Sequence, residues 1–178
     1  MSSNEIAMLK SIDDEIREYF FQTARDAGVS EDEIERVWSD RQAMNEVLPE
    51  GHEWKISKFT RSRKNVLRGL HGDKVTWKNI TCVWGEIYLV VVDNRPESPN
   101  YNKWESYIIS ERNHLSVLVP PEFVNGHLCL TDECLFHYTQ SYPKEYVDWF
   151  DQEEVKWNDS QIGIEWPIDN PILNWRDK

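Results

Sequence analysis

The chain has 178 residues, enough for one full domain with a sizeable core but too few for two large domains. Its 39% hydrophobic and 29% charged residues are typical of a globular protein, and no apolar run approaches the ~20 residues that span a bilayer. We therefore expect no membrane partner. The net charge of −12 argues against a nucleic-acid partner, because phosphate backbones require a broad basic surface.

The beginning of the chain and its cysteines indicate a reducing cytoplasm. Residues 1–5 lack the basic region and apolar stretch of a signal peptide. The cysteines Cys82, Cys129 and Cys134 are odd in number and unclustered. We therefore expect neither a disulfide framework nor a zinc site.

Two helices are predicted in the first fifty residues. Apolar residues recur at helical spacing up to Gly28, which supplies a stop. Ser30 and Glu33 then form a capping box, and a second apolar face continues until Pro49. The sequence therefore predicts a helical hairpin over residues 1–51.

Positive charge is concentrated just after this hairpin. Residues 1–57 hold 14 acidic and 6 basic side chains. The next stretch, residues 58–78, holds a single acid, Asp73, against seven basic side chains: Lys58, Arg61, Arg63, Lys64, Arg68, Lys74 and Lys78. Such a local field suits the capture of a small anion such as a diphosphate. A solvated basic strand edge is the alternative.

Short strands separated by turns are predicted from Trp54 onward. The strongest runs are Lys78–Asp93, Glu105–Ser110, Leu115–Val119, Gly126–Leu130 and Cys134–Gln140. The final stretch, which is rich in tryptophan and proline, reads as an irregular covering segment. Many short strands without a second helical block predict a sandwich or barrel.

The strand-like segment Val66–His71 carries two residues suited to chemistry, Arg68 and His71. A lone histidine at a strand end is more often a structural or surface residue than a catalyst. Strict alternation would send the two side chains to opposite faces of a sheet. A bulge at Gly69 would bring both to the same face.

Several motifs resemble the dTDP-4-dehydrorhamnose 3,5-epimerase family over residues 55–178. In chain order they are Leu67-Arg68-Gly69-Leu70-His71, Lys78 with Gly85, Val91 to Pro99, Lys103-Trp104, Ile109-Ser110, Val119-Pro120, Gly126, Trp157-Asn158-Asp159, Ile164 to Pro167 and Arg176-Asp177. Two further segments, His71-Gly72-Asp73 and Thr81 to Glu86, are more similar to the branch that acts on GDP-4-keto-heptoses.

The resemblance implies a mainly β fold, the double-stranded β-helix or cupin jelly roll, over residues 52–178. Here the helical hairpin stands where the family has two strands that reach across a homodimer, and nothing before Trp54 resembles those strands. The family site holds no metal, and the histidines of this chain include no His-X-His pair of the kind that a metal cupin needs. We expect no metal, no cofactor and a homodimer.

The resemblance also implies an epimerase that inverts carbon 3, carbon 5 or both in a dTDP- or GDP-linked 4-keto sugar. The residues that match family positions are the base His71, its orienting partner Asp177, the cation Lys78 and the acid Tyr138, with Arg68, Lys58, Asn125 and Tyr142 as substrate contacts. Without the resemblance, Tyr138 could equally be an ordinary strand residue, Lys78 a solvent-facing side chain and Asp177 an acid in a frayed C-terminus.

One departure from the family pattern keeps alternatives open. Asn125 stands where the dTDP enzymes carry a second histidine, and an asparagine binds a hydroxyl but does not exchange protons. The alternatives are a 3-epimerase that inverts a single centre and a catalytically silent protein that binds nucleotide sugars.

Overall fold

The structure is a computed structural model that describes residues 18, 21–22, 24–26, 28–32, 34, 48–49, 52–148 and 150–178. The chain divides into two units, Met1–Pro49 and Glu50–Lys178. In the described part of the chain, no helix is long and apolar enough to cross a membrane.

Helical residues flank a turn in the first unit. Residues 18, 21–22, 24–26, 31–32 and 34 are helical, and at the turn the Gly28 amide donates to the Arg25 carbonyl at 2.9 Å. Phe21 and Ile34 are buried against each other. The hairpin expected over residues 1–51 lies largely outside the described residues, so it stays a prediction.

Eight main strands build the second unit. In chain order they are β1 (Ile56–Arg63), β2 (Val66–Gly72), β3 (Trp77–Trp84), β4 (Glu86–Asp93), β5 (Trp104–Ser110), β6 (Ser116–Val119), β7 (Phe123–Cys129) and β8 (Glu133–Ser141). One sheet has the order β1-β8-β3-β6 and the other contains β2-β7-β4-β5, all antiparallel. This order is that of a jelly roll, so the mainly β cupin-type fold is confirmed.

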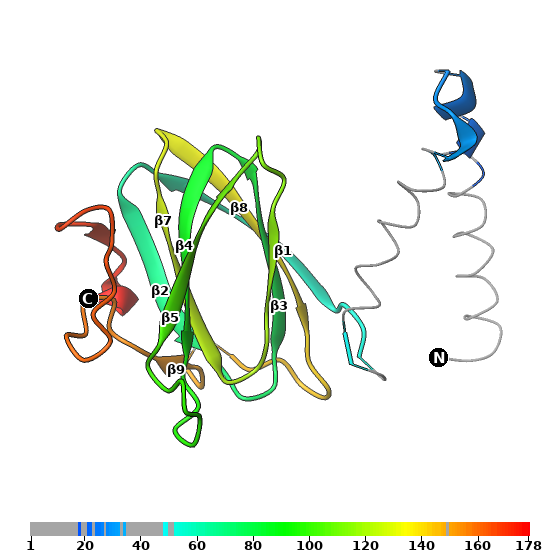
Figure 1. Ribbon diagram of the computed structural model, residues 1–178. Coiled ribbons are helices and arrows are strands. Elements are labelled where there is room, and N and C mark those ends of the chain that lie inside the picture. The colour runs from blue at the N-terminus through cyan, green and yellow to red at the C-terminus, as the bar shows by residue number, and fades with distance from the viewer. Residues whose placement is uncertain are drawn as a thin grey trace. The chain divides into compact units, whose positions relative to one another are not determined.

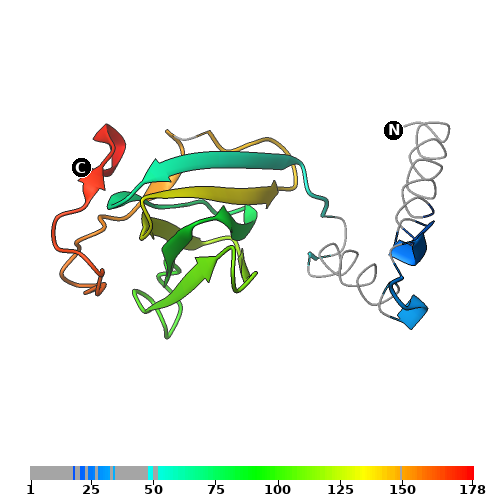
Figure 2. The same cartoon turned by 90° about the horizontal axis from the view of Figure 1, so that it is seen from above.

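The two sheets lie face to face (Figures 1 and 2). Alternate residues point inward, and between the sheets they form a buried core that includes Ile80, Leu89, Ile109 and Val119. This core fills only part of the space, because other inward positions of the same strands are polar. Those polar positions surround the cavity described below.

A C-terminal segment, residues 150–178, covers the outer face of the sheet that contains β2, β7, β4 and β5. Two short strands of this segment extend that sheet to six strands. Its partly buried side chains Val155, Ile164 and Trp166 pack on a second cluster that includes Leu70 and Val90. The segment is mostly turns, with two short strands, β9 (Glu153–Glu154) and β10 (Ile172–Leu173), that pair with β2, and a 3-10 helix, η1 (Trp175–Asp177). The expected irregular covering segment is confirmed.

Two local features of the strands bear on the sequence-based expectations. The run predicted over Lys78–Asp93 is two strands, because the chain turns at Gly85 with a φ of 73°. The expected bulge is confirmed, since Arg68 pairs with His127 and His71 with Asn125. Two residues of β2 thus face one residue of β7, and Arg68 and His71 both point inward.

Candidate functional site

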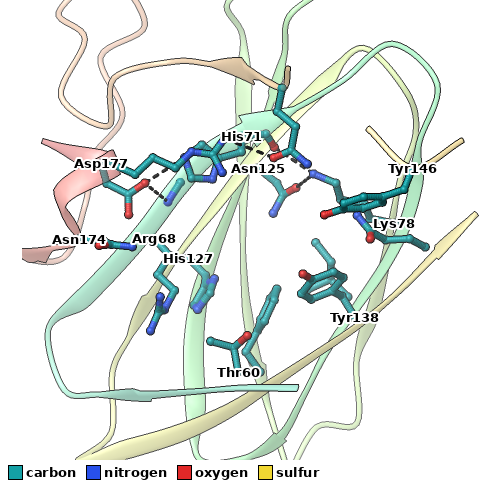
Figure 3. A pocket seen from close by; sticks show the side chains of 16 residues that line it. Thr60, Arg68, His71, Lys78, Asn125, His127, Tyr138, Tyr146, Asn174 and Asp177 are labelled. Carbon is teal, nitrogen blue, oxygen red and sulfur yellow. Dashed lines mark hydrogen bonds and ion pairs between the residues drawn. The ribbon is translucent and has the colours of Figure 1, made fainter. Parts of the chain in front are cut away.

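A cavity of about 280 Å³ opens between the two sheets. Residues from three parts of the fold surround it (Figure 3). The six-stranded sheet contributes Arg68, Gly69, His71, Asn125 and His127, the four-stranded sheet contributes Thr60, Lys78, Ile80, Phe136, Tyr138 and Gln140, and the following segment contributes Tyr146, Gln152, Asn174, Arg176 and Asp177.

His71 and Asp177 form a hydrogen-bonded pair on one side of this cavity. The His71 Nε2 lies 2.9 Å from the Asp177 Oδ1, and the Asp177 side chain is only 2% exposed. The Gly69 amide also donates to Asp177 Oδ1, at 3.3 Å. The carboxylate fixes Nε2 as the protonated nitrogen, so the lone pair of Nδ1 is free to accept a proton.

Lys78 brings a buried ammonium group next to this pair. Its Nζ donates to the His71 carbonyl oxygen at 3.1 Å and to the Asn125 Oδ1 at 3.2 Å. Burial lowers the pKa of Lys78 from 10.5 to about 8, although the nearby charge of Asp73 raises it. The group is therefore a cation at neutral pH and has no dense shell of water to screen it.

Tyr138 lies on the other side of the cavity, on the opposite sheet (Figure 3). Burial raises the pKa of its phenol above the ordinary value, whereas the positive charge of Lys58 lowers it. A raised pKa keeps the phenol protonated at neutral pH. The arrangement therefore sets a proton acceptor and a proton donor on facing sides of one cavity.

Arg68 and His127 are neighbours at another part of the wall, at paired positions of β2 and β7. The Arg68 Nε donates to the Ser62 hydroxyl at 3.0 Å. The His127 ring stacks on Phe136 with 4.1 Å between centroids. Burial, followed by the positive charge of Arg68, lowers the pKa of His127 to about 3, so this imidazole is neutral.

The remaining two expected contacts, Lys58 and Tyr142, lie beside Tyr146 rather than among the cavity-lining residues. The Lys58 Nζ donates to the Tyr146 hydroxyl at 3.3 Å and lies 4.6 Å from the centre of that ring. Tyr142 packs against Tyr146 with 5.9 Å between centroids. The structure thus brings six of the eight expected residues to the cavity and links the other two to it through Tyr146.

The basic stretch of residues 58–78 divides between the inside and the surface. Arg68 and Lys78 reach the cavity, and Lys58 lies next to it. The other four, Arg61, Arg63, Lys64 and Lys74, are exposed, and surface ion pairs join Arg61 to Glu133, Lys64 to Asp132 and Lys74 to Glu153. A solvated surface therefore describes part of the stretch, and the other part lines or borders the cavity, where anion capture stays a prediction.

Several cavity-lining residues were not expected from the sequence, among them Thr60, His127, Phe136, Gln140 and Tyr146. Strand alternation carries a signal for some of them. His127 lies two residues after Asn125, and Phe136 and Gln140 lie two residues on either side of Tyr138. Positions two apart share a face, so these side chains follow from the expected ones.

No group of three or more histidine, cysteine or carboxylate side chains lies where it could hold a metal ion, within the residues that the structure describes. The three cysteines are buried thiols. The chemistry that the described cavity offers directly is proton transfer, hydrogen bonding and charge stabilisation by its own side chains.

A model of the dTDP-4-dehydrorhamnose 3,5-epimerase family matches residues 33–178. The match begins at residue 33, ahead of the range 55–178 over which the quoted motifs occur. The motifs quoted above are concentrated in the jelly roll, and they carry no information about this preceding stretch.

Individual relatives agree with the family match. The dTDP-4-dehydrorhamnose 3,5-epimerase of Methanothermobacter thermautotrophicus is 32% identical over 170 residues, which cover 91% of this chain and 80% of the relative. The dTDP-4-dehydrorhamnose 3,5-epimerase of Shigella flexneri is 35% identical over 121 residues, which cover 66% of this chain and 65% of the relative.

Solved structures share the fold. The dTDP-4-dehydrorhamnose 3,5-epimerase of Bacillus anthracis, with TDP and PPi bound, is 33% identical with a TM-score of 0.69, covering 76% of this chain and 78% of that one. A 3'-monoepimerase of Streptomyces bikiniensis in complex with dTDP-quinovose is 29% identical with a TM-score of 0.65, covering 78% and 69%. The chain therefore belongs to the dTDP-4-dehydrorhamnose 3,5-epimerase family, which are isomerases acting on nucleotide sugars.

Proposed function

We propose that the chain epimerises a 4-keto sugar carried on a nucleoside diphosphate, at carbon 3, carbon 5 or both. One observation carries the proposal: the candidate base His71 and the candidate acid Tyr138 belong to different sheets and face the same cavity. A sugar ring held between them loses a proton from one face and gains one on the other. That sequence inverts the carbon.

The hydrogens on carbons 3 and 5 are both acidic, because each lies next to the carbonyl at carbon 4. Nδ1 of His71 takes the proton, and the electron pair of the broken C–H bond moves to the carbonyl oxygen to give an enolate. The ammonium of Lys78 stabilises this negative charge. Tyr138 then gives its phenolic proton to the carbon from the other face. Solvent removes the proton from His71 and returns one to Tyr138.

We propose dTDP as the nucleotide, since the relatives in the comparisons are named for dTDP sugars. A GDP-linked heptose is the alternative that the segment His71-Gly72-Asp73 favours. Arg68 is suited to the diphosphate in either case, because a guanidinium can donate two parallel hydrogen bonds to phosphate oxygens.

We also propose a homodimer, which light scattering would detect as twice the mass of the chain.

A single-centre 3-epimerase is the second candidate, favoured by Asn125. This amide occupies the position of a family histidine, and its Oδ1 already accepts a hydrogen bond from Lys78. An amide does not exchange protons, so the proton transfers fall to His71 and Tyr138. One of the similar solved structures is likewise that of a 3'-monoepimerase.

Deuterium incorporation separates these candidates. The chain is incubated in heavy water with a dTDP-linked 4-keto-6-deoxyhexose, and in parallel with a GDP-linked 4-keto sugar, and the products are followed by NMR. Deuterium at carbons 3 and 5 supports the 3,5-epimerase, and deuterium at carbon 3 alone supports the single-centre enzyme. If neither nucleotide sugar gains deuterium, the enzyme proposal fails and the catalytically silent binding protein is the remaining candidate.

The variant Tyr138→Phe tests the division of labour between base and acid. His71 still removes a proton and returns a deuteron to the same face, so we expect labelled substrate with inversion reduced by about a hundredfold or more. Tyr146→Phe is the matched control, because it removes another phenol from the cavity wall and should leave inversion largely intact. Full inversion by Tyr138→Phe would mean that the acid is another group.

A further inference from the structure

The proton transfers proposed above leave two buried polar side chains of the cavity without a role, His127 and Gln140. The His127 side chain lines the cavity and the residue is 3% exposed. Among the described residues, its Nε2 is buried and has no hydrogen-bond partner. Gln140 also has an unpartnered buried atom and lines the same cavity, but its amide ends a flexible side chain next to Lys78 in the strand register.

An unpartnered nitrogen in this position costs folding free energy. Buried polar atoms are nearly always hydrogen-bonded, and one that is not has lost its water without gaining a replacement. A phenylalanine at position 127 would fill a similar volume and stack on Phe136 without that cost. The imidazole therefore carries a hydrogen-bonding capacity that the unliganded fold does not use.

The ring is also held in place before any ligand arrives. His127 lies on Phe136 with an angle of 10° between the two rings, and its backbone pairs with Arg68 on the neighbouring strand. Two charged groups face it from the elements packed around it, Arg68 from β2 and Asp177 from η1, and their effects on its pKa oppose each other. The imidazole therefore lies near both Arg68, the candidate for binding the diphosphate, and Asp177 of the His71–Asp177 pair.

Because the His127 ring is neutral, only some chemical groups of a ligand are suitable hydrogen-bond partners for it. Burial keeps the imidazole neutral, so it offers one N–H donor and one acceptor nitrogen. A hydroxyl group can bond to whichever of the two nitrogens it meets, because it can accept from the N–H or donate to the acceptor nitrogen. A phosphate oxygen only accepts, and the cation suited to it is the adjacent Arg68.

We propose that His127 determines specificity by hydrogen-bonding a hydroxyl group of the bound sugar. The inference rests on the proposed function for the class of ligand, a nucleotide sugar, but it does not require that the sugar react. A site that hydrogen-bonds a substrate hydroxyl discriminates strongly against ligands that lack it, since the buried polar group is then left unpaired.

Binding measurements with His127→Phe test the proposal. Isothermal titration calorimetry compares dTDP with dTDP-glucose, which lacks the 4-keto group and is not turned over. If the wild-type chain binds only GDP, then GDP and GDP-mannose are the matched pair. We expect the Kd of the sugar nucleotide to rise about tenfold, equivalent to about 1.4 kcal/mol, while the Kd of the free nucleotide stays unchanged. His127→Gln, which keeps a hydrogen-bonding amide, should recover part of the loss.

Thermal unfolding of the unliganded variant supplies the second readout. Because His127→Phe removes an unpartnered nitrogen and keeps the stacking, its melting temperature should equal or exceed that of the wild type. A purely structural histidine would give the opposite, a less stable variant with normal sugar binding.

Two results would overturn the inference. An equal loss of affinity for the nucleotide and the sugar nucleotide would place the contact at the diphosphate. Unchanged affinity for the nucleotide and for the sugar nucleotide would show that His127 only packs against its neighbours and does not bind the sugar. Neither result depends on catalysis, so a chain that binds sugar nucleotides but incorporates no deuterium contradicts the proposed function alone.

Discussion

Raising the pH through about 8 should abolish activity by neutralising Lys78. Its ordinary pKa of 10.5 falls to about 8 chiefly because the group is buried. The difference corresponds to roughly 3 kcal/mol against the charged form. The pKa is lowered, so the ammonium is present below about pH 8 and lost above it. Since the enolate needs that charge, we expect kcat/KM to fall about tenfold for each further pH unit.

The assay is the initial rate of deuterium incorporation between pH 6 and 10, with two variants for comparison. Lys78→Arg keeps a positive charge throughout this range, so its rate, though reduced by the altered geometry, should show no decline near pH 8. Asp73→Asn should move the decline to lower pH, because the Asp73 charge raises the pKa of Lys78. Asparagine preserves an acceptor for the amides of Val75 and Thr76, which bond to Oδ1 of Asp73.

The reasoning fails if the wild-type rate stays level to pH 10. It fails equally if Lys78→Arg declines at the same pH as the wild type, because another group would then be responsible. Tyr138 is an unsuitable explanation for a decline near pH 8, since burial raises its pKa above the usual value for a phenol.

Two further substitutions test the pair and the bulge that positions it. Asp177→Asn should lower kcat by about a hundredfold or more with little change in nucleotide-sugar affinity, since an amide no longer fixes the tautomer of His71 or stabilises its cation; steady-state kinetics showing a loss below threefold would contradict this role. Gly69→Ala should destabilise the fold by roughly 3 kcal/mol or more in urea unfolding, because φ is 112° and a Cβ would lie 2.5 Å from the Gly126 Cα. Gly163→Ala is the control, since its φ of 65° is strained but nothing lies within 4 Å, and equal losses in both variants would refute the steric argument.

The sequence predicts the strands whose inward positions are apolar and misses the one whose inward positions are polar. β1 has Lys58, Thr60 and Ser62 on its inner face, so it shows no alternation of apolar and polar residues. The reason is physical, because this face borders the cavity rather than the core. Alternation identifies a strand only when one face is buried in apolar surroundings.

The candidate site was predicted from the family resemblance more than from the residues alone. His71 and Asp177 are far apart in the chain, and the pairing of β9 and β10 with β2 brings the C-terminal segment to the base. Such a long-range contact leaves no local pattern. The position of His127 in the cavity wall was missed for a related reason, since strand alternation shows that a side chain points inward but not whether it meets the core or the cavity.

The bulge in β2 constrains how this strand can vary between descendants of a common ancestor. If these same residues of β2 paired regularly with β7, His71 would lie opposite Val124 instead of Asn125, and its side chain would point away from Asp177. Leu70 packs on the opposite face of the sheet, where other apolar side chains are acceptable. We therefore expect the bulged pairing at this point of β2 to be inherited more faithfully than the identity of residue 70.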